Sequence, residues 1–308
     1  MSIKRIGIFG MGALGILYGH HMTERLGRES VYFIMDEKRL QRFKQNPPLC
    51  NGEPTDFRAT ADQMEAEPAD LLIFAVKGTD LEEAMETAAP HIGKETILLS
   101  LLNGISSEGM IGERFGKEQV LYCVAQGMDA VKTDNQLSYT KMGHLLVGVP
   151  AEETEKLPLL DQVCRLFDDI QLPYERDPDI RRRIWSKFML NVGVNQIVMV
   201  HEGTYGTIQQ SGPAREQMKA AMREVIQISS HEGIPVTEED LEYYVALVDT
   251  LSPEGMPSMR QDGLAQRPSE VEFFAGTVLR LAEKYHLDLP VNRELYNRIK
   301  AMESRYIQ

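Results

Sequence analysis

The sequence predicts an N-terminal doubly wound α/β domain followed by an all-α domain. Short apolar runs alternate with helical stretches from Ile3 to about Tyr174, and a glycine-rich loop follows the first of these runs. After Pro173 and the polar stretch Glu175–Asp179 the strand pattern is absent, and helical periodicity continues towards the C-terminus. We therefore expect residues 1–178 to form the first domain and residues 179–308 the second.

Length, composition and charge narrow the class of protein. A chain of 308 residues is long enough for two cores, because single cores stop growing at roughly 250 to 300 residues. The sequence has no apolar run near the ~18 residues of a membrane span, no secretory signal, and three cysteines without paired spacing, Cys50, Cys123 and Cys164. We therefore expect a soluble, cytoplasmic protein without a metal site or a membrane partner. The formal net charge of -13 argues against a nucleic-acid partner, whose phosphates require clustered Lys and Arg.

The strands of the first domain are continuous apolar runs, which are typical of parallel strands covered on both faces. Four such runs are Ile6–Phe9, Val31–Ile34, Leu71–Val76 and Thr96–Leu101. The segments between them are long enough for crossover helices. Two later runs, Val120–Val124 and His144–Val149, are expected to extend the sheet, with the polar segment Lys132–Gln136 as a turn between them.

The second domain is expected to consist of long helices. They are predicted over Ile180–Val200, Gly212–Glu232, Glu238–Thr250, Ser269–Tyr285 and Asn292–Arg305. The polar stretch Glu175–Asp179 precedes them at the domain boundary. The loop Ser252–Pro257 contains two prolines and a glycine, which break helices. The basic run Arg181–Arg183 is either a solvated helix start or an anion attractor at the domain junction.

The loop Gly10–Gly15 has the pattern GxGxxG, and its place between an apolar strand and a helix makes it a strong signal for dinucleotide binding. Gly10 permits the tight turn, Gly12 leaves room for the pyrophosphate, and Gly15 allows close packing of the helix. The helix N-terminus supplies amide donors and a partial positive charge. The loop residues expected to bind a nicotinamide dinucleotide, as in Rossmann domains, are Gly10, Met11, Gly12, Ala13, Leu14 and Gly15.

An acid, Asp36, ends the second apolar run, about 20 residues beyond the loop, where Rossmann proteins commonly bind the ribose 2′-hydroxyl. A carboxylate at this point repels the extra phosphate of NADP(H) and so favours NAD(H). Lys38 and Arg39, just beyond it, offer compensation by pairing with that phosphate. The local chemistry therefore predicts that NADH is used at least comparably to NADPH.

Lys187, Asn191 and Asn195 lie at positions i, i+4 and i+8 of the first long helix. Each step of four residues advances the angle by only ~40°, so the three side chains project from one face of the helix. That face is polar in an otherwise apolar helix, and a row of unpaired buried polar groups is costly. The face therefore either meets the other domain or lines a site.

Two further polar residues, Ser258 and Glu270, lie at the start of later helical segments. The ordinary role of a serine at such a place is to cap the helix, and the ordinary role of a glutamate is that of a first-turn acid. Taken alone, neither residue indicates a site.

Together these patterns resemble the ketopantoate reductase (2-dehydropantoate 2-reductase) family, and the resemblance covers essentially the whole chain. The features that agree are the glycine loop, Lys77 after the third apolar run, Asn103 within Leu101-Leu102-Asn103-Gly104, the Lys187/Asn191/Asn195 spacing, and Ser258 with Glu270 twelve residues later. The resemblance implies a Rossmann-type domain joined to a helical domain similar to that of 6-phosphogluconate dehydrogenase. It also implies reduction of 2-dehydropantoate to D-pantoate by hydride transfer from NADP(H), in pantothenate biosynthesis.

The resemblance also implies a role for each site residue. Lys187 resembles the general acid that protonates the carbonyl oxygen, and Glu270 resembles the acid that helps to hold substrate and cofactor and orients Lys187. Lys77 is implied as a cofactor contact, with a surface lysine as the alternative. Asn103 resembles the residue that bridges cofactor and substrate. The hydrogen-bonding partners of the substrate are implied at Asn191, Asn195 and Ser258.

Two alternatives to ketopantoate reduction are left open. Some family members carry a further asparagine where this chain has Tyr205, and related proteins of this fold reduce other 2-keto acids, so one alternative is a D-2-hydroxyacid dehydrogenase. The other is a dinucleotide-binding sensor without turnover, which predicts a degraded polar constellation in the second domain. Here those residues are all present. As partners we expect a 2-keto acid and, as one option, a second copy in a homodimer.

Overall fold

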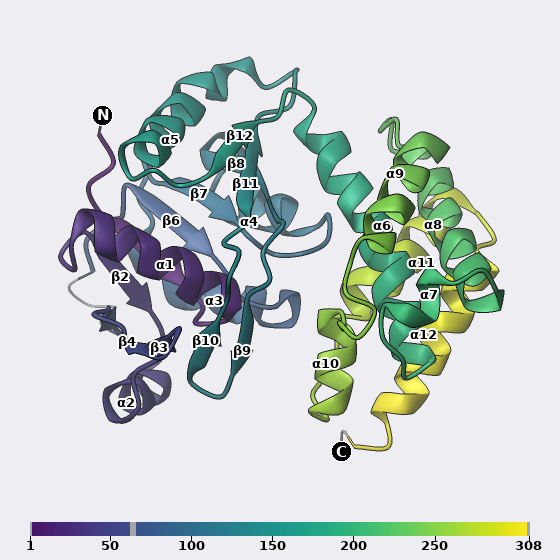
Figure 1. The fold of residues 1–308 in the computed structure, drawn as a ribbon. Coiled ribbons are helices and arrows are strands. Elements are labelled where there is room, and N and C mark those ends of the chain that lie inside the picture. Colours follow the sequence, from purple (N-terminus) through teal and green to yellow (C-terminus); the bar gives the residue numbers. More distant parts are fainter. Residues whose placement is uncertain (1, 62–65, 307–308) are drawn as a thin grey trace. The chain divides into compact units, whose positions relative to one another are not determined.

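The computed structural model describes residues 2–61 and 66–306. The chain folds into two compact units, Met1–Ile180 and Arg181–Gln308 (Figure 1). The first unit is built on an eight-stranded sheet with helices on both faces, and the described elements of the second unit are all helical. The predicted fold class, a Rossmann-type α/β domain followed by an all-α domain, is therefore confirmed.

The large sheet has the strand order β12-β11-β8-β7-β6-β1-β2-β5. Its strands are β1 (Ile6–Phe9), β2 (Val31–Ile34), β5 (Arg58–Thr60), β6 (Leu71–Phe74), β7 (Ile97–Ser100), β8 (Val120–Gln126), β11 (His144–Gly148) and β12 (Tyr174–Arg176). All neighbours pair in parallel except β8 and β11, which are antiparallel. The chain runs outwards from β1 to β2 in one direction and from β6 to β7 in the other. The boundary between β1 and β6 is therefore the topological switch point, where such sheets bind their ligands.

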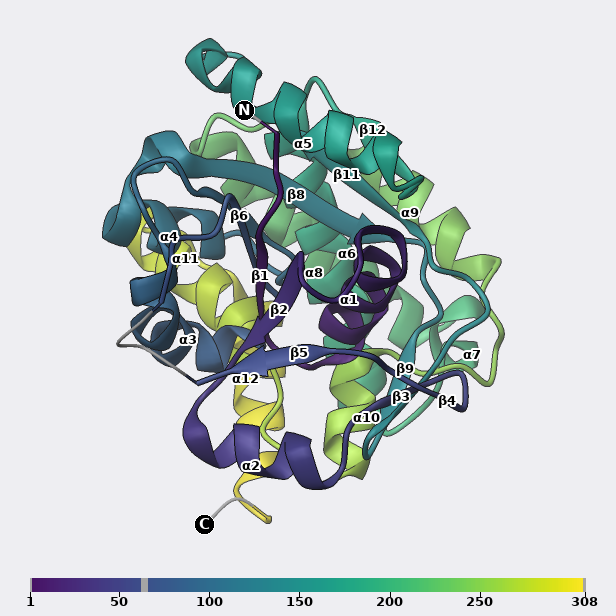
Figure 2. The ribbon, with the colours of Figure 1, turned by 90° about the vertical axis from the view of Figure 1, so that its left-hand side faces the viewer.

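Helices cover both faces of this sheet, which explains why its strands are apolar throughout. They are α1 (Ala13–Leu26) and α5 (Leu157–Asp169) on one face, with α3 (Leu81–Ala88) and α4 (Ser107–Phe115) on the other. Figure 2 shows α1 on one side of β1 and β6, and α3 and α4 on the opposite side. Along β6, Ile73 belongs to the core under α1, whereas Phe74 belongs to the core under α3. Successive residues thus pack on opposite faces of the sheet, because the side chains of a strand alternate between its two faces.

A second, four-stranded sheet contains the turn predicted within Lys132–Gln136, at Asp134 and Asn135, and adds flanking strands that were not predicted. Its order is β4-β3-β10-β9, formed by β3 (Leu49–Cys50), β4 (Glu53–Pro54), β9 (Val131–Thr133) and β10 (Gln136–Ser138). The segment predicted as a turn forms part of the β9–β10 hairpin, and Leu137 of β10 is fully buried beside Cys50. Strands of two or three residues are too short to show a period in sequence, so the prediction missed them.

A further strand that was not predicted follows Pro173. The next three residues form β12, which pairs in parallel with β11, so that Tyr174 lies opposite Leu145. This strand lies at the edge of the sheet, and its remaining residues, Glu175 and Arg176, are exposed and charged. Edge strands commonly carry such residues, which removes the apolar signal of a central strand.

The second unit contains five helices that correspond to the five predicted ones. They are α6 (Ile180–Val200), α8 (Pro213–His231), α9 (Glu238–Asp249), α11 (Thr277–Tyr285) and α12 (Pro290–Glu303), with the shorter α7 (Gly206–Gln209) and α10 (Ser258–Leu264) between them. The prediction that a helix begins at Ser269 is wrong. Helical structure begins with a π-helical turn over Glu272–Gly276, in which the Gly276 amide donates to the Val271 carbonyl at 2.9 Å. The Ser269 amide, which lies before this turn, donates to the Glu303 carboxylate at 2.7 Å.

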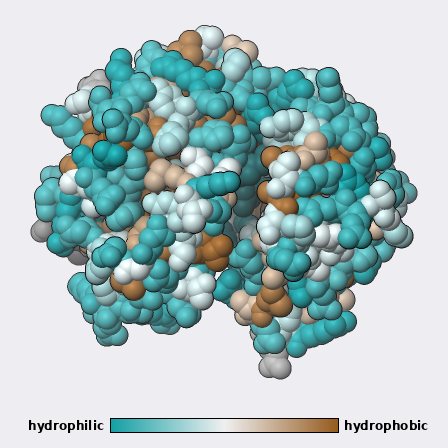
Figure 3. Space-filling view, in the orientation of Figure 1, coloured by the Kyte–Doolittle hydropathy of each residue, from teal (hydrophilic) through white to brown (hydrophobic). Residues whose placement is uncertain are grey.

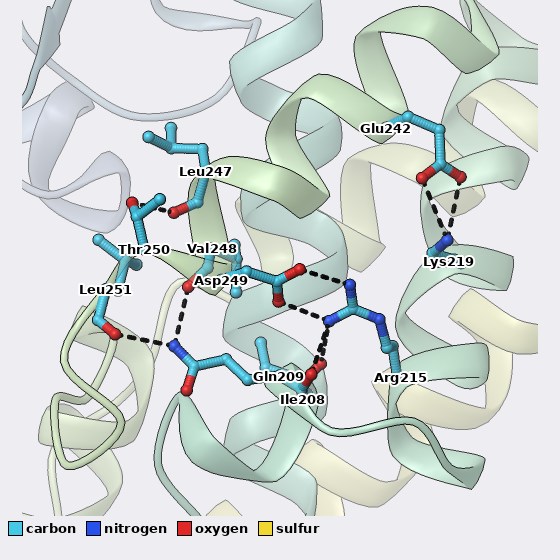
Figure 4. A network of polar contacts seen from close by, with 10 residues as sticks. All are labelled: Ile208, Gln209, Arg215, Lys219, Glu242, Leu247, Val248, Asp249, Thr250 and Leu251. Carbon is cyan, nitrogen blue, oxygen red and sulfur yellow. Dashed lines mark hydrogen bonds and ion pairs between the residues drawn. The ribbon is translucent and has the colours of Figure 1, made fainter.

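Ionic and amide contacts join three of these helices (Figure 4). From α8, the Arg215 guanidinium makes two hydrogen bonds of 2.7 Å to the Asp249 carboxylate of α9, and Arg215 also donates to the Ile208 carbonyl of α7 at 2.9 Å. These bonds hold the pKa of the Asp249 carboxyl below its ordinary value. Gln209 of α7 donates to the Val248 carbonyl at 2.9 Å. Because the pair is bidentate, it fixes the orientation of α8 and α9 as well as their distance.

The basic run at the start of α6 takes part in the same kind of contact. Arg182 donates to both carboxylate oxygens of Asp240 in α9 at 3.0 Å. Asp240 also accepts the Thr237 amide hydrogen at 2.8 Å in a capping box at the start of α9. Arg182 thus lies at the start of α6 with a partly exposed side chain, and it also forms a structural contact between α6 and α9.

The surface drawn in Figure 3 is mostly hydrophilic, and its hydrophobic residues form small separate groups. Among the described helices, none is long and apolar enough to cross a membrane. In the part of the chain that the structure describes, no three His, Cys, Asp or Glu side chains gather into a group able to hold a metal ion.

Candidate active site

Four of the loops that carry predicted cofactor residues follow parallel strands of the large sheet. The glycine loop follows β1, Asp36 follows β2, Lys77 follows β6, and Asn103 follows β7. Because these strands are parallel neighbours, their carboxyl ends share one edge of the sheet. The structure therefore brings these residues to the edge that includes the switch point between β1 and β6.

The three glycines of the first loop differ in what their own surroundings require. Gly10 has φ +115°, and a Cβ there would lie 2.5 Å from the Ala75 carbonyl oxygen. A Cβ on Gly15 would collide with the Gly10 carbonyl oxygen. A Cβ on Gly12, in contrast, would meet only Ala75, at an ordinary contact distance of 3.6 Å. The packing of the protein thus explains Gly10 and Gly15, but it leaves space above Gly12.

That space lies at the N-terminus of α1, where Gly12 is the N-cap residue and supplies no side chain to cap the helix. The first amides of a helix carry a partial positive charge and are a ready binding site for phosphate. The space and the amides fit a pyrophosphate. The intervening Met11, Ala13 and Leu14 are partly buried and pack against the core, so their contribution to a ligand would come mainly from the backbone.

Asp36 has a structural role that the sequence did not indicate. It is the N-cap of α2 (Glu37–Gln45), and its carboxylate accepts the Arg39 amide hydrogen at 2.7 Å. The other carboxylate oxygen lies 3.3 Å from the Arg39 guanidinium. An acid and a base are therefore paired directly after β2, and the charge of Asp36 is partly balanced by its neighbour.

Lys77 and Asn103 occupy the two loops beyond the switch point. Lys77 precedes a short 3-10 helix, Gly78–Asp80, whose last amide donates to the Lys77 carbonyl at 3.0 Å. Asn103 lies in the loop that joins β7 to α4, next to Gly104, which has φ +102°. This backbone conformation favours glycine and turns the chain directly after Asn103.

In the helical unit, α6 carries the predicted polar face. The Asn195 side-chain amide donates to the Asn191 side-chain oxygen at 3.4 Å, which places the two asparagines side by side. Lys187 lies one turn before Asn191 on the same helix. The Nδ2 amide of Asn191 is buried, and no described protein atom accepts its hydrogens. A buried donor of this kind is costly unless a bound molecule satisfies it.

Asn195 connects this face to α10. Its side-chain oxygen accepts hydrogen bonds from the Ser258 hydroxyl and from the Met259 amide, both at 3.3 Å. Ser258 is therefore not the N-cap of α10, a position that Pro257 occupies. Because Asn195 is only 6% exposed, its amide group is held firmly between the two helices.

Glu270 lies just before the π-helical turn and is 7% exposed. It is thus not a first-turn acid of a regular helix. The neighbouring Ser269 is bound by Glu303, and the Ser269 hydroxyl accepts the Val271 amide hydrogen at 3.3 Å. These contacts fix the backbone on both sides of Glu270.

Sequence reasoning missed Glu303, although a signal was present. Leu295, Ile299 and Glu303 lie at i, i+4 and i+8 of α12, and all three are buried. An acid at the third position of an apolar face requires a partner, and the Ser269 amide is that partner.

Comparisons with known proteins cover nearly the whole chain. The family model described as ketopantoate reductase PanE/ApbA matches residues 6–152, and the model of its C-terminal part matches residues 179–303. A 2-dehydropantoate 2-reductase of Vibrio cholerae is 29% identical over 98% of each chain, and that of Archaeoglobus fulgidus is 27% identical over 99% of each.

Solved structures share the fold. A PanE/ApbA family ketopantoate reductase from Ralstonia eutropha superimposes with a TM-score of 0.84 at 20% identity, covering 99% of this chain and 100% of that one. A D-mandelate dehydrogenase, solved with NADH and anilino(oxo)acetate, has a TM-score of 0.81 at 22% identity over 98% of this chain and 99% of its own.

Proposed function

The chain belongs to the ketopantoate reductase PanE/ApbA family of oxidoreductases, and from this premise we propose that it reduces 2-dehydropantoate to D-pantoate with a nicotinamide dinucleotide. The observation that carries the proposal is the polar face of α6. There the buried Asn191 amide has no described acceptor, and it lies next to the hydrogen-bonded pair of Asn195 and Ser258. A 2-keto acid offers the oxygens that such donors need. Relatives of this chain are named as 2-dehydropantoate 2-reductases, which supports 2-dehydropantoate as the substrate.

In this proposal Lys187 is the general acid. When bound, the dihydronicotinamide supplies a hydride to the keto carbon, and negative charge develops on the keto oxygen. The Lys187 ammonium stabilises that charge and transfers a proton from Nζ to the oxygen, which completes the hydroxyl group of the product. Glu270 orients Lys187 and helps to hold substrate and cofactor, while Asn103 bridges the two.

The remaining polar residues position the substrate. Asn191 would donate from Nδ2 to a substrate oxygen, and the Ser258 hydroxyl is exposed enough to contact the same molecule. Asn195 would act from a fixed orientation, since both its oxygen and its amide nitrogen already have partners. Such preorganised groups favour one orientation of the keto carbon for attack.

For the cofactor, the glycine loop and the N-terminus of α1 would bind the pyrophosphate, and Lys77 would provide a further contact. We propose that both dinucleotides are used, NADH at least comparably to NADPH. The Asp36 carboxylate opposes a 2′-phosphate, whereas Arg39, 3.3 Å away, reduces that opposition. The D-mandelate dehydrogenase of the same fold was solved with NADH, which supports the use of NADH on this scaffold.

A D-2-hydroxyacid dehydrogenase is the second candidate function, and Tyr205 favours it. The Tyr205 amide donates to the Gly255 carbonyl at 2.9 Å, and a Cβ on Gly255 would lie 3.0 Å from the tyrosine ring. This ring thus packs against the loop that leads to Ser258, where some family members carry a smaller polar residue. An aromatic ring at this place would suit a keto acid whose side chain differs from that of 2-dehydropantoate.

One experiment separates these functions. NADPH and NADH oxidation is followed with a panel of 2-keto acids that includes ketopantoate and the aromatic keto acid corresponding to mandelate. The highest kcat/KM with ketopantoate is the expected result, and a clear preference for the aromatic acid would favour the second candidate. Because a similar fold occurs in the dimeric ketopantoate reductase of Staphylococcus aureus, the oligomeric state should be measured on the same preparation, with a homodimer as the proposal.

A further inference from the structure

The loop that carries Asn103 rests on a buried chain of hydrogen bonds. The Leu102 amide donates to the Ser100 hydroxyl oxygen at 3.2 Å, and the Ser100 hydroxyl donates to the Ser107 hydroxyl oxygen at 2.8 Å. The Ser107 hydroxyl in turn donates to the Glu108 carboxylate at 2.9 Å. The chain runs from the backbone next to Asn103, across the end of β7, to the first turn of α4.

Every member of this chain is shielded from water. Ser100 is 0% exposed, Ser107 is 3% exposed, and Glu108 is 7% exposed. Burial raises the pKa of the Glu108 carboxyl to about 7. An acid in such a place lowers stability when it is charged, and a nonpolar side chain would fill the same volume without that cost. The presence of an acid is therefore informative.

The direction of the hydrogen bonds indicates what the acid does. Each donor points towards Glu108, so the carboxylate sets the orientation of both serine hydroxyls and leaves the Ser100 oxygen facing the Leu102 amide. Hydrogen bonds in a chain of this kind polarise and strengthen one another. Gly104 then turns the backbone on the other side of Asn103. The Asn103 loop is thus held from the Leu102 side by the hydrogen-bond chain.

We propose that Glu108 is a positioning residue for hydride transfer, which acts through Ser107 and Ser100 to hold the Asn103 side chain where cofactor and substrate meet. This inference rests on the proposed function, in which Asn103 bridges the two molecules. A displacement of the reacting groups by about 1 Å can lower a rate a hundredfold, so a residue that touches neither molecule is able to affect turnover strongly.

The test is a cycle of variants measured with the best keto acid. Glu108→Ala and Ser107→Ala each break the chain and should lower kcat/KM about tenfold or more. Glu108→Gln keeps an acceptor for Ser107 and should recover most of the loss. Glu113→Ala, on the exposed side of the same helix, is the matched control and should behave as the unmodified enzyme.

The decisive comparison is with Asn103→Ala. If Glu108 acts through Asn103, Glu108→Ala should have little further effect on kcat/KM in the Asn103→Ala background. A full additional loss in that background would overturn the proposal, as would Glu108→Ala and Ser107→Ala variants that fold and turn over normally. If Glu108→Ala does not fold, Ser107→Ala in the two backgrounds decides the question.

Failure of the function and failure of this inference give different results. Unmodified enzyme that oxidises neither dinucleotide with any keto acid of the panel would overturn the proposed function and the inference with it. Unmodified enzyme that turns over, with variants of Glu108 and Ser107 that match it, would overturn the inference alone.

Discussion

The Asn195 side-chain oxygen accepts the Ser258 hydroxyl hydrogen at 3.3 Å, although 63 residues separate them in sequence. The same oxygen accepts the Met259 amide hydrogen, so a side chain of α6 binds the first turn of α10. Two residues that the sequence could identify only separately therefore form one unit in the helical part of the chain.

This pairing predicts coupled effects on catalysis. Ser258→Ala removes one of two donors to the buried Asn195 oxygen, and we expect kcat/KM for the keto acid to fall by up to about tenfold, since one hydrogen bond contributes about 0.5 to 1.5 kcal/mol. In an Asn195→Ala background the same change should cost less, because the partner is already absent. Strictly additive losses would contradict the coupling. Ser252→Ala, in the exposed loop before α10, is the control.

Replacement of Lys187 tests the general acid. Lys187→Ala should lower kcat by roughly 10² to 10⁴, the usual contribution of a positioned acid, while dinucleotide binding measured by fluorescence titration stays close to normal. The binding measurement separates a catalytic defect from a folding defect. A near-normal kcat on the best keto acid would show that another group supplies the proton.

Asn191 should affect activity more than stability. Asn191→Ala should lower kcat/KM by a factor equivalent to about 1 to 3 kcal/mol of binding free energy, because the substrate loses a hydrogen bond. The thermal stability of the free protein should change less, since the variant removes a buried donor that lacks a described acceptor but also removes the acceptor of the Asn195 amide. A clear loss of stability with unchanged kcat/KM would assign Asn191 a structural role only.

The choice of dinucleotide is tested at Asp36. Asp36→Asn keeps an oxygen to cap α2 and removes the charge, so the variant changes electrostatics with little effect on the helix. A carboxylate about 5 Å from a 2′-phosphate repels it by roughly 3 kcal/mol per unit charge at an effective dielectric near 20, before compensation. We therefore expect the ratio of kcat/KM for NADPH to that for NADH to rise. A hundredfold preference for NADPH in the unmodified enzyme would reject the proposed use of NADH.

The buried Glu108 predicts a pH effect on stability. Its pKa in the folded protein is about 7, above the ordinary 4.5, so the folded state binds the proton more tightly than the unfolded state does. The resulting stabilisation is fully present below about pH 4.5 and is lost as pH rises through about 7. Glu108→Gln lacks this titration. Its free energy of unfolding, relative to that of the unmodified protein, should therefore rise by up to about 3 kcal/mol as the pH increases over that range. Thermal unfolding of both proteins across the range is the measurement, and a pH-independent difference would contradict the titration.

Local patterns in the sequence determined much of this protein. The apolar runs from Ile6 to Ser100 predict the central strands, because a strand covered on both faces must be apolar throughout. The spacing of Lys187, Asn191 and Asn195 predicts a shared face, because helical geometry alone places them there. The glycine pattern is likewise read within one short segment, although part of the reason for Gly10 is the distant Ala75 carbonyl. Each of these patterns lies in residues close together in sequence, which is why the sequence reveals them.

Tertiary structure alone decided the contacts between distant residues. Glu303 binds the Ser269 amide 34 residues away, and helical structure begins only at the π-helical turn further on. Asp36 becomes the cap of α2, and β12 exists because β11 offers it an edge. Such outcomes depend on which donors and acceptors packing brings together. Neither the period nor the composition of a segment contains that information, since the partner lies elsewhere in the chain.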